Sequence, residues 1–400
     1  MLNEWHAEVE EVYDQMVDWR RHLHENPELP FQEVQTARMV EDILAGYGIK
    51  VQRNIGGHGV VEILKGGKTG PTIALRADMD ALPIQQKNDV PYKSRVPNVM
   101  HACGHDAHTA TLLGVAKILS KDEDQLYGTV KFIFQPAEEQ FPGGAIQMLE
   151  EGVLEGGDAI FGNHVLSSVP LGNFTVPKGS ATASSDYVRI RIIGKGGHSS
   201  APHTSVNPIV IGAQIITQIH LLMSQKLNPV QPVVAAITVF NSGGTINVIP
   251  EEAAIEGTVR TFNQEQRENV QTILTHILNN VTVTYGATYE MEYTRGYPQL
   301  VNTEKETKVV RDLLDNINHL NVVEMHPIMA SEDFAYYLQQ VPGVYFYTGS
   351  AIDDPTTQFP QHHPKFNIDE QAMKNSAKGF LSIVHYYLVP DDALKKFSLY

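Results

Sequence analysis

The sequence predicts an α/β protein into which a smaller α+β domain is inserted. Short apolar runs alternate with segments of helical spacing at both ends of the chain, as in a sheet covered by helices on both faces. Between them, from about Ser184 to Arg295, the pattern changes to β-α-β-β-α-β, the split, ferredoxin-like arrangement. We therefore expect an outer domain of residues 1–183 and 296–400, and an inserted domain of residues 184–295.

The first part of the outer domain reads as helices followed by buried strands. Apolar spacing predicts helices at residues 8–24 and 36–47, the second ended by Gly48. Continuous apolar runs of strand length then predict strands that are buried on both faces. These runs lie at residues 60–64, 72–76, 129–134 and 159–162, with a further helix at residues 108–119.

The inserted domain and the last part of the chain follow the same rules. Alternation of apolar and basic residues at 187–193 is typical of a half-exposed strand. In the rest of the insert we expect strands at residues 233–240, 254–262 and 281–293, and helices at residues 206–223 and 264–279. After it we expect helices at residues 303–316, 332–340 and 369–387, and a buried strand at residues 343–348.

Composition excludes several classes of protein. The formal net charge of −16 argues against a nucleic-acid partner, because phosphate binding needs clustered Lys and Arg. No stretch approaches the roughly 18 unbroken apolar residues of a membrane span. The start of the chain, residues 1–14, has acidic residues and no apolar core, so we expect no secretory signal and a cytoplasmic location. The single cysteine, Cys103, excludes an intrachain disulfide.

The densest chemical cluster surrounds that cysteine, in the segment His101-Ala102-Cys103-Gly104-His105-Asp106-Ala107-His108. Cys103 and His105 can both point at one metal ion, because Gly104 lets the backbone turn tightly between them. Asp106 and His108 are candidates to orient these ligands.

Further candidates follow the predicted strands. Glu138 and Glu139 come just after the strand at residues 129–134, where one carboxylate could bind metal and the other could take a proton. His164 follows the run at residues 159–162, and Asp78 and Asp80 follow the run at residues 72–76. Near the end of the chain, either His362 or His363 could reach the same site. In the insert, glycine-rich segments surround His198 and Asn247, a pattern that by itself favours hairpin turns.

Together these motifs resemble the zinc-peptidase-like M20 superfamily, in its branch of N-acyl-amino-acid amidohydrolases, hippurate hydrolases and auxin-conjugate hydrolases. The resemblance runs from about residue 20 to residue 387. It implies a catalytic domain with a mixed sheet flanked by helices, and an inserted lid that also forms a homodimer. The motifs that carry it are Arg21-His22-Leu23-His24-Glu25-Asn26-Pro27-Glu28, Arg76-Ala77-Asp78-Met79-Asp80-Ala81-Leu82-Pro83, Met100-His101-Ala102-Cys103-Gly104-His105-Asp106, Ala137-Glu138-Glu139, Gly197-His198-Ser199, Ser331-Glu332-Asp333-Phe334 and His362-His363-Pro364.

The resemblance also implies roles for single residues. Two divalent metal ions per subunit are expected, Zn²⁺ first and Mn²⁺, Co²⁺ or Ni²⁺ as alternatives. Glu138 takes the place of the general base, Asp80 orients a ligand, and His198 helps to bind the developing oxyanion. Asn247 and Arg260 resemble lid residues near the substrate. The implied metal ligands are Cys103, His105, Glu139, His164 and His362.

The implied reaction is hydrolysis of the amide bond of a small N-acyl amino acid, which releases a carboxylic acid and a free amino acid. An N-acetyldiaminopimelate deacetylase or a dipeptidase of the same family is the alternative. A covalent Cys103 nucleophile would leave His164 and the carboxylate pair without a role. A non-catalytic metal-binding module would not need Glu138 beside Glu139.

Overall fold

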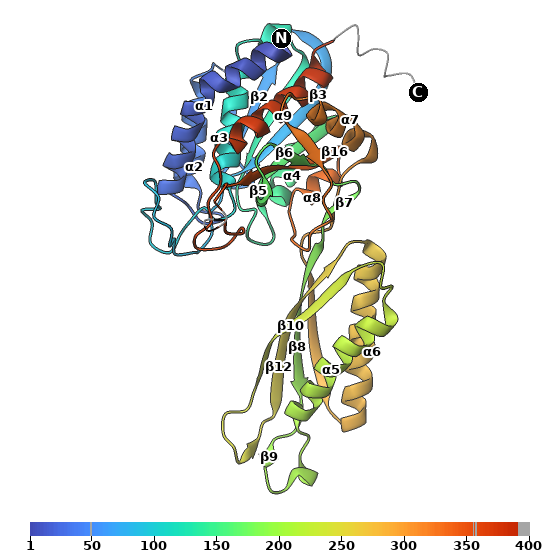
Figure 1. Ribbon diagram of the computed structural model, residues 1–400. Helices are drawn as coiled ribbons and strands as arrows, with labels where there is room; N and C mark the ends of the chain where they lie inside the picture. The colour runs from blue at the N-terminus through green and yellow to red at the C-terminus, as the bar shows by residue number, and fades with distance from the viewer. Residues whose placement is uncertain (49, 355, 357, 391–400) are drawn as a thin grey trace. The chain divides into compact units, whose positions relative to one another are not determined.

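The computed structural model describes residues 1–48, 50–354, 356 and 358–390, which form two compact units (Figure 1). Unit 1 comprises Met1–Ala181, Val301–His326 and the described residues from Asp333 onward. Unit 2 comprises Thr182–Leu300 and Pro327–Glu332. Across the described part of the chain, each helix is too short or too polar to cross a lipid bilayer.

Unit 1 is built on a mixed sheet of eight strands. In spatial order these are β1 (Lys50–Ile55), β2 (Gly59–Lys65), β4 (Tyr127–Gln135), β3 (Lys68–Asp78), β5 (Ala159–Pro170), β16 (Gly343–Ala351), β6 (Asn173–Thr175) and β15 (Asn321–Val323). The four central strands, β4, β3, β5 and β16, are parallel, whereas β2 and β6 run antiparallel to their neighbours β4 and β16. The carboxyl ends of the central strands therefore meet at one edge, where open α/β sheets bind ligands.

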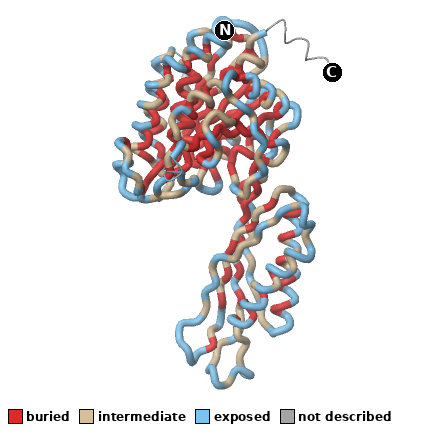
Figure 2. The backbone as a smooth tube through the Cα atoms, viewed as in Figure 1, coloured by how far each residue is buried: buried red, intermediate tan, exposed pale blue. Residues whose placement is uncertain are grey.

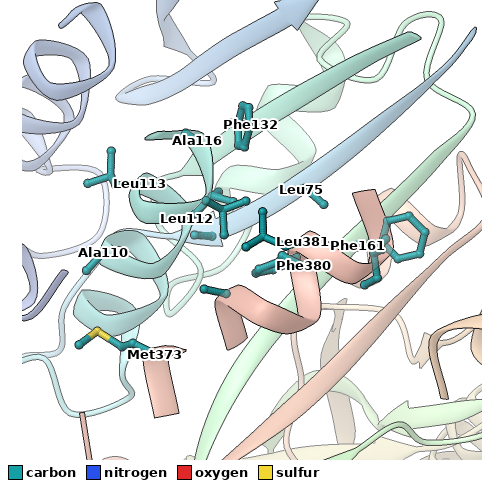
Figure 3. Packing of buried hydrophobic residues seen from close by; sticks show 14 of the residues in the cluster. Leu75, Ala110, Leu112, Leu113, Ala116, Phe132, Phe161, Met373, Phe380 and Leu381 are labelled. Carbon is teal, nitrogen blue, oxygen red and sulfur yellow. The ribbon is translucent and has the colours of Figure 1, made fainter. Parts of the chain in front are cut away.

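The helices of unit 1 are α1 (Leu2–Glu25), α2 (Val34–Ala45), α3 (His105–Leu119), α4 (Gly144–Glu150), α7 (Glu304–Asp315), α8 (Ala335–Leu338) and α9 (Ala372–Leu388), with a 3₁₀ turn, η1 (Glu123–Gln125). Helices α1, α3 and α9 pack against one another, and α3 is buried along almost its whole length. Figure 3 shows Leu112 of α3 and Leu381 of α9 gathered with Leu75 of the sheet in this core.

Alternation along β3 separates the two faces of the sheet. Leu75 points into the core beneath α3 and α9, whereas its neighbour Arg76 reaches Asp333, just before α8. The buried backbone of unit 1 accordingly lies in the sheet and the helices beside it (Figure 2).

Unit 2 has a four-stranded antiparallel sheet with the order β10-β12-β8-β13, formed by β8 (Ser184–Ile193), β10 (Val233–Ser242), β12 (Glu252–Thr261) and β13 (Thr288–Arg295). Helices α5 (Pro208–Lys226) and α6 (Gln264–Tyr285) pack against the sheet and against each other (Figure 1). Shorter elements are β9 (Gly197–His198), η2 (Pro202–Thr204) and β11 (Val248–Ile249), while β7 (Ser180–Thr182) and β14 (Leu300–Val301) lie where the chain passes between the units. This β-α-β-β-α-β unit confirms the predicted ferredoxin-like arrangement, and unit 1 confirms the predicted mixed sheet flanked by helices.

Two element predictions were wrong. Residues 281–285 continue α6 instead of starting a strand, because Val281 extends the buried helical stripe of Leu274 and Leu278, and Gly286 (φ 72°) ends the helix. The helix expected at residues 332–340 shrinks to α8. Residues 332–334 form a loop and a turn, in which the Asp333 carboxylate accepts hydrogen bonds from Arg76 of β3 and Gln135 of β4.

Candidate metal centre

Strand register places three of the chemical segments at one level of the sheet. Asp78, the last residue of β3, is paired with Gln135, the last residue of β4. On the other side of β3, Arg76 is paired with Gly162, so His164, two residues further along β5, lies level with Asp78. The turn that bears Glu138 begins directly after Gln135, and therefore starts at the same edge.

The segment Cys103-Gly104-His105 enters this edge at the start of α3. Gly104 has a φ of +106°, and a Cβ there would lie 2.5 Å from Cγ2 of Val165. Only glycine fits such a position without strain and clash. The tight turn allows Cys103 to place its Sγ atom 3.3 Å from Nε2 of His164, while His105 opens the helix.

The structure brings the predicted ligand atoms of unit 1 together. Within each of several overlapping groups, one nitrogen, sulfur or oxygen atom per residue lies within 4.8 Å of the others, as a metal site requires. These groups are Cys103 with His105 and His164, Cys103 with Glu139 and His362, and His105 with Glu138 and Glu139.

The structure also distinguishes the two histidines near the end of the chain. Nε2 of His362 lies 3.1 Å from Oε1 of Glu139, and the His362 backbone N–H donates to the carbonyl of Ala102 at 2.7 Å. His363 instead stacks on Phe359, with ring centroids 4.4 Å apart. His362 is therefore the histidine that belongs to the cluster.

His105 shows that the cluster carries excess negative charge. Its Nδ1 lies 3.0 Å from the carbonyl oxygen of Asp80, and its Nε2 lies 3.7 Å from Asp78 and 3.9 Å from Glu139. Although burial opposes the charged ring, the carboxylates of Asp78, Asp80 and Glu139 raise the pKa of His105 to about 10. Nε2 is buried and has no hydrogen-bond partner among the residues that the structure describes. A metal cation in place of this proton would satisfy both the orphaned nitrogen and the surplus carboxylates.

The other two donors fit the same interpretation. Burial lowers the pKa of His164 well below its ordinary value, so its imidazole is neutral and able to donate to a metal. Burial, together with Glu139 and Glu138, raises the pKa of Cys103 well above its ordinary value. Such a thiol is a poor free nucleophile, and it ionises when a cation replaces its proton. A set of thiolate, imidazole and carboxylate donors suits Zn²⁺ and similar divalent ions.

Asp78 and His108 hold the backbone next to His164 in place. His108 places Nδ1 2.6 Å from Asp78, and its Nε2 accepts the backbone N–H of Val165. Asp78 also accepts a hydrogen bond from Arg76 at 2.6 Å, and both side chains are fully buried. Asp78 is therefore committed to Arg76 and His108, and it holds the residue next to His164 through the His108 ring.

Asp106 faces away from the ligands. Its Oδ2 accepts from Nε of Arg20 at 3.1 Å and lies 2.8 Å from Nδ1 of His24. The Arg20 guanidinium also donates to Glu370, beyond the His362 loop, at 2.9 Å. This buried network connects α1 to the segment that carries Cys103 and His105 and to the segment that follows His362.

The sequence interpretation missed two of these supporting residues, namely Arg20 and Arg76 as an ion-pair partner. A signal existed for Arg76, because a charged residue at the end of an apolar strand must be paired when it is buried. Its partner Asp333 could not be identified from the sequence, because it lies 257 positions away.

The remaining candidates lie in unit 2. His198 of β9 is paired with Val248 of β11, and the N–H of Ser199 donates to the carbonyl of Asn247 at 3.1 Å, so His198 and Asn247 are neighbours. Their loops adjoin the Glu251 end of β12, where the N–H of Gly194 donates to Glu251.

Arg260 lies at the other end of β12 and donates to Oγ of Ser331 at 3.0 Å. The strand from Glu252 to Arg260 spans about 26 Å. The structure thus brings His198 and Asn247 together and separates both of them from Arg260.

Comparison with known proteins identifies relatives along most of the chain. The family model for peptidase family M20/M25/M40 matches residues 74–386. The Bacillus subtilis protein YhaA is 42% identical over 379 residues, which cover 94% of this chain and 96% of that protein. Thermostable carboxypeptidase 2 of Saccharolobus solfataricus is 42% identical over 373 residues, covering 92% and 94%. An N-acyl-L-amino acid amidohydrolase of Geobacillus stearothermophilus is 43% identical over 297 residues, covering 74% and 80%.

A solved structure shows the same fold. The YXEP protein of Bacillus subtilis, described as a dinuclear metal-binding peptidase of the M20 family, has a TM-score of 0.83 and 35% sequence identity to this chain. The match covers 94% of this chain and 98% of that one.

Proposed function

The chain belongs to peptidase family M20/M25/M40, and within this family we propose that it is a metal-dependent amidohydrolase that hydrolyses N-acyl amino acids to a carboxylic acid and a free amino acid. The observation that carries the proposal is the buried carboxylate of Glu138 next to a cluster of thiolate, imidazole and carboxylate donors. A site that only bound metal would not need this extra carboxylate. The N-acyl-L-amino acid amidohydrolase of Geobacillus stearothermophilus supports the choice of substrate class.

We propose that two divalent cations are held by Cys103, His105, Glu139, His164 and His362, with Zn²⁺ as the resident metal and Mn²⁺, Co²⁺ or Ni²⁺ as substitutes. When bound, such cations act as Lewis acids that polarise a carbonyl group and acidify water.

The chain's own groups would handle the proton. Glu138 accepts the proton of the attacking water and then donates it to the nitrogen of the leaving amino acid. Asp80 keeps two ligands in place, because its Oδ2 accepts the backbone N–H of Glu139 at 2.9 Å and its Oδ1 lies 3.2 Å from Nδ1 of His105. Asp80 therefore acts by orientation and not by proton transfer.

We further propose a homodimer formed through unit 2. His198 and Arg260 are separated by about 26 Å of strand, so the two side chains of one lid cannot both contact one small substrate. In the proposed dimer, Arg260 of one subunit binds the substrate carboxylate. The partner subunit's His198 supplies a hydrogen bond to the oxyanion, with the partner's Asn247 beside it.

The surface of unit 2 supports an association of this kind. β10 is an edge strand with exposed Val234 and Phe240, and the adjoining helix α5 exposes Val210 and Leu221. Long apolar edge strands are normally covered, and a second copy of the chain would cover this one.

A peptide substrate is the alternative, and the 42% identity to a carboxypeptidase supports it. The same groups would hydrolyse a peptide bond, whether in a dipeptide or beside a free C-terminus. An N-acetyldiaminopimelate deacetylase would use them in the same way. These activities differ only in the shape of the substrate and not in the chemistry of Glu138.

A substrate panel with defined metals tests the proposal. The enzyme is stripped with a chelator, its metal content is measured, and it is reconstituted separately with Zn²⁺, Mn²⁺, Co²⁺ and Ni²⁺. Each form is assayed on N-acetyl and N-benzoyl amino acids and on dipeptides. We expect no turnover without metal and the highest kcat/KM on an N-acyl amino acid. Full turnover by verified metal-free enzyme would refute the metal-dependent assignment, and a preference for dipeptides would establish the alternative.

A further inference from the structure

We infer that Glu33 is a positioning residue for the reaction, because its carboxylate fixes the turn that aims Glu138 at the substrate. This inference rests on the proposed role of Glu138. It concerns a residue outside the ligand cluster, on a loop before α2, to which neither the sequence interpretation nor the resemblance assigns a role.

One oxygen atom of Glu33 joins two distant segments. Oε1 accepts the backbone N–H of Ala137 at 2.8 Å, and it also accepts the N–H of Phe31 at 3.1 Å. Ala137 directly precedes Glu138. Glu33 and Ala137 are both fully buried, so water cannot replace the hydrogen bond if the carboxylate is removed.

The residue that Glu33 holds has an unusual backbone. Ala137 has a φ of +53°, in the left-handed region that residues with a Cβ rarely adopt. Its carbonyl accepts the N–H of Gly144 at 3.0 Å, and the N–H of Glu139 is bound by Asp80. The turn is thus fastened on both sides of Glu138. Asp80 binds the N–H of Glu139, on the metal-ligand side of Glu138. Glu33 binds the N–H of Ala137, whose φ would otherwise relax to a negative value.

Helix capping does not explain Glu33. It stands at the N-cap of α2, yet its side chain makes no capping hydrogen bond. The carboxylate of Glu28 makes those bonds, accepting from the N–H groups of Gln35 and Thr36 at 2.9 and 2.8 Å. Glu33 is therefore free to hold the turn, whereas Glu28 serves the helix.

The charge of Glu33 is not what the turn requires. Burial, assisted by the Asp80 carboxylate, raises the pKa of Glu33 to about 7. A substantial fraction is therefore neutral near pH 7, and what Ala137 needs is an acceptor oxygen. A glutamine provides that oxygen at the same position, whereas a methionine fills the same space without it.

Three variants and one control test this role in the metal-loaded full-length enzyme. They are Glu33→Met, Glu33→Gln, the double variant Glu33→Met with Ala137→Gly, and Glu28→Met as the control from the same loop. For each we would measure kcat, KM, bound metal and the folded fraction by circular dichroism.

Glu33→Met should lower kcat by about 10- to 100-fold, as expected for a small misplacement of a reacting group, while KM and bound metal stay close to wild type. Glu33→Gln should keep most of the kcat. Glycine adopts positive φ without strain, so the double variant should recover part of the loss. Glu28→Met should lower stability and leave kcat unchanged.

Wild-type kcat in Glu33→Met would overturn the inference, and so would a loss in Glu33→Gln equal to that in Glu33→Met. If Glu33→Met does not fold, the Gln variant still decides, because a large loss of kcat there would refute an acceptor role. Failure of the proposed function is distinguishable, since Glu138→Gln would then be fully active. If Glu138→Gln is inactive while Glu33→Met is normal, only the inference about Glu33 fails.

Discussion

The Nε2 atom of His108 accepts a hydrogen bond from the backbone N–H of Val165 at 2.9 Å. Nε2 therefore carries no proton, and the proton on Nδ1 points to Asp78, 2.6 Å away. Because Val165 follows His164, this single ring connects the carboxyl end of β3 to the histidine of β5.

Replacing His108 should therefore weaken metal binding without touching a ligand. His108→Ala leaves the N–H of Val165 buried without a partner and frees the ring of His164 to shift. We expect metal affinity to fall by about 10- to 100-fold, as for other residues that orient ligands. Competition with a chromophoric chelator measures the change. His22→Ala, on the exposed face of α1, is the control, and equal affinities in the two variants would exclude the role of His108.

Glu138 and Glu139 should fail in different ways. Glu138→Gln should lower kcat by about 10²- to 10⁴-fold while the protein still binds metal, because a general base is lost. Glu139→Gln should lose metal first, since the amide is a weaker ligand than the carboxylate. Metal analysis alongside steady-state kinetics separates the two. Near-normal turnover by metal-loaded Glu138→Gln would show that another group moves the proton.

Stability should depend on pH through Glu62, which lies in β2. Both of its carboxylate oxygens are buried and lack hydrogen-bond partners in the described part of the chain, and burial raises its pKa to about 8. The folded state therefore binds this proton more tightly than the unfolded state, whose glutamate has a pKa of about 4.3. The free energy of unfolding should fall as pH rises from about 4 to about 8 and then level off.

Glu62→Gln should remove this dependence. Relative to wild type, the variant should gain on the order of a few kcal/mol between pH 5 and pH 8, measured by urea unfolding at each pH. Glu151→Gln, on an exposed turn, is the control for the loss of one charge. A constant difference between wild type and Glu62→Gln across this range would contradict the prediction.

Alanine variants of Gly104 and Gly286 separate the cost of backbone strain from the cost of steric crowding by the added Cβ. Both have positive φ, but a Cβ at Gly286 meets no described residue within 4 Å, whereas one at Gly104 lies 2.5 Å from Val165. Gly286→Ala should cost about 1–2 kcal/mol of stability from backbone strain alone. Gly104→Ala should cost about 2–5 kcal/mol and also weaken metal binding, because overpacking adds to the strain. Thermal unfolding and metal titration of both proteins would reveal whether their costs differ.

The proposed dimer predicts complementation between inactive variants. His198→Ala and Arg260→Ala should each lose most activity alone. After mixing and subunit exchange, about a quarter of the sites should combine an intact Arg260 with the partner's intact His198. Recovered activity at that level supports sharing of the site. If exchange is verified by mass and no activity returns, each subunit supplies both residues to its own site.

Local pattern predicted much of the fold. Apolar spacing is set by the 3.6- and 2-residue periods, which a short window reveals, so most helices and strands were predictable. The errors arose where that window is ambiguous. Val281 has a strand-forming side chain but continues the buried stripe of α6, and the Asp333 carboxylate is bound by side chains of β3 and β4.

By itself the sequence determined the fold class, through the order of its predicted helices and strands. It also determined the kinds of ligand, because Cys103-Gly104-His105 and Glu138-Glu139 each lie next to a predicted element. Only the tertiary structure decided which groups meet. It set Arg76 against Asp333, 257 positions away, and it placed Glu33 on Ala137, 104 positions away. Such contacts leave no local signature, since they depend on how the whole core packs and on which buried polar groups remain to be satisfied.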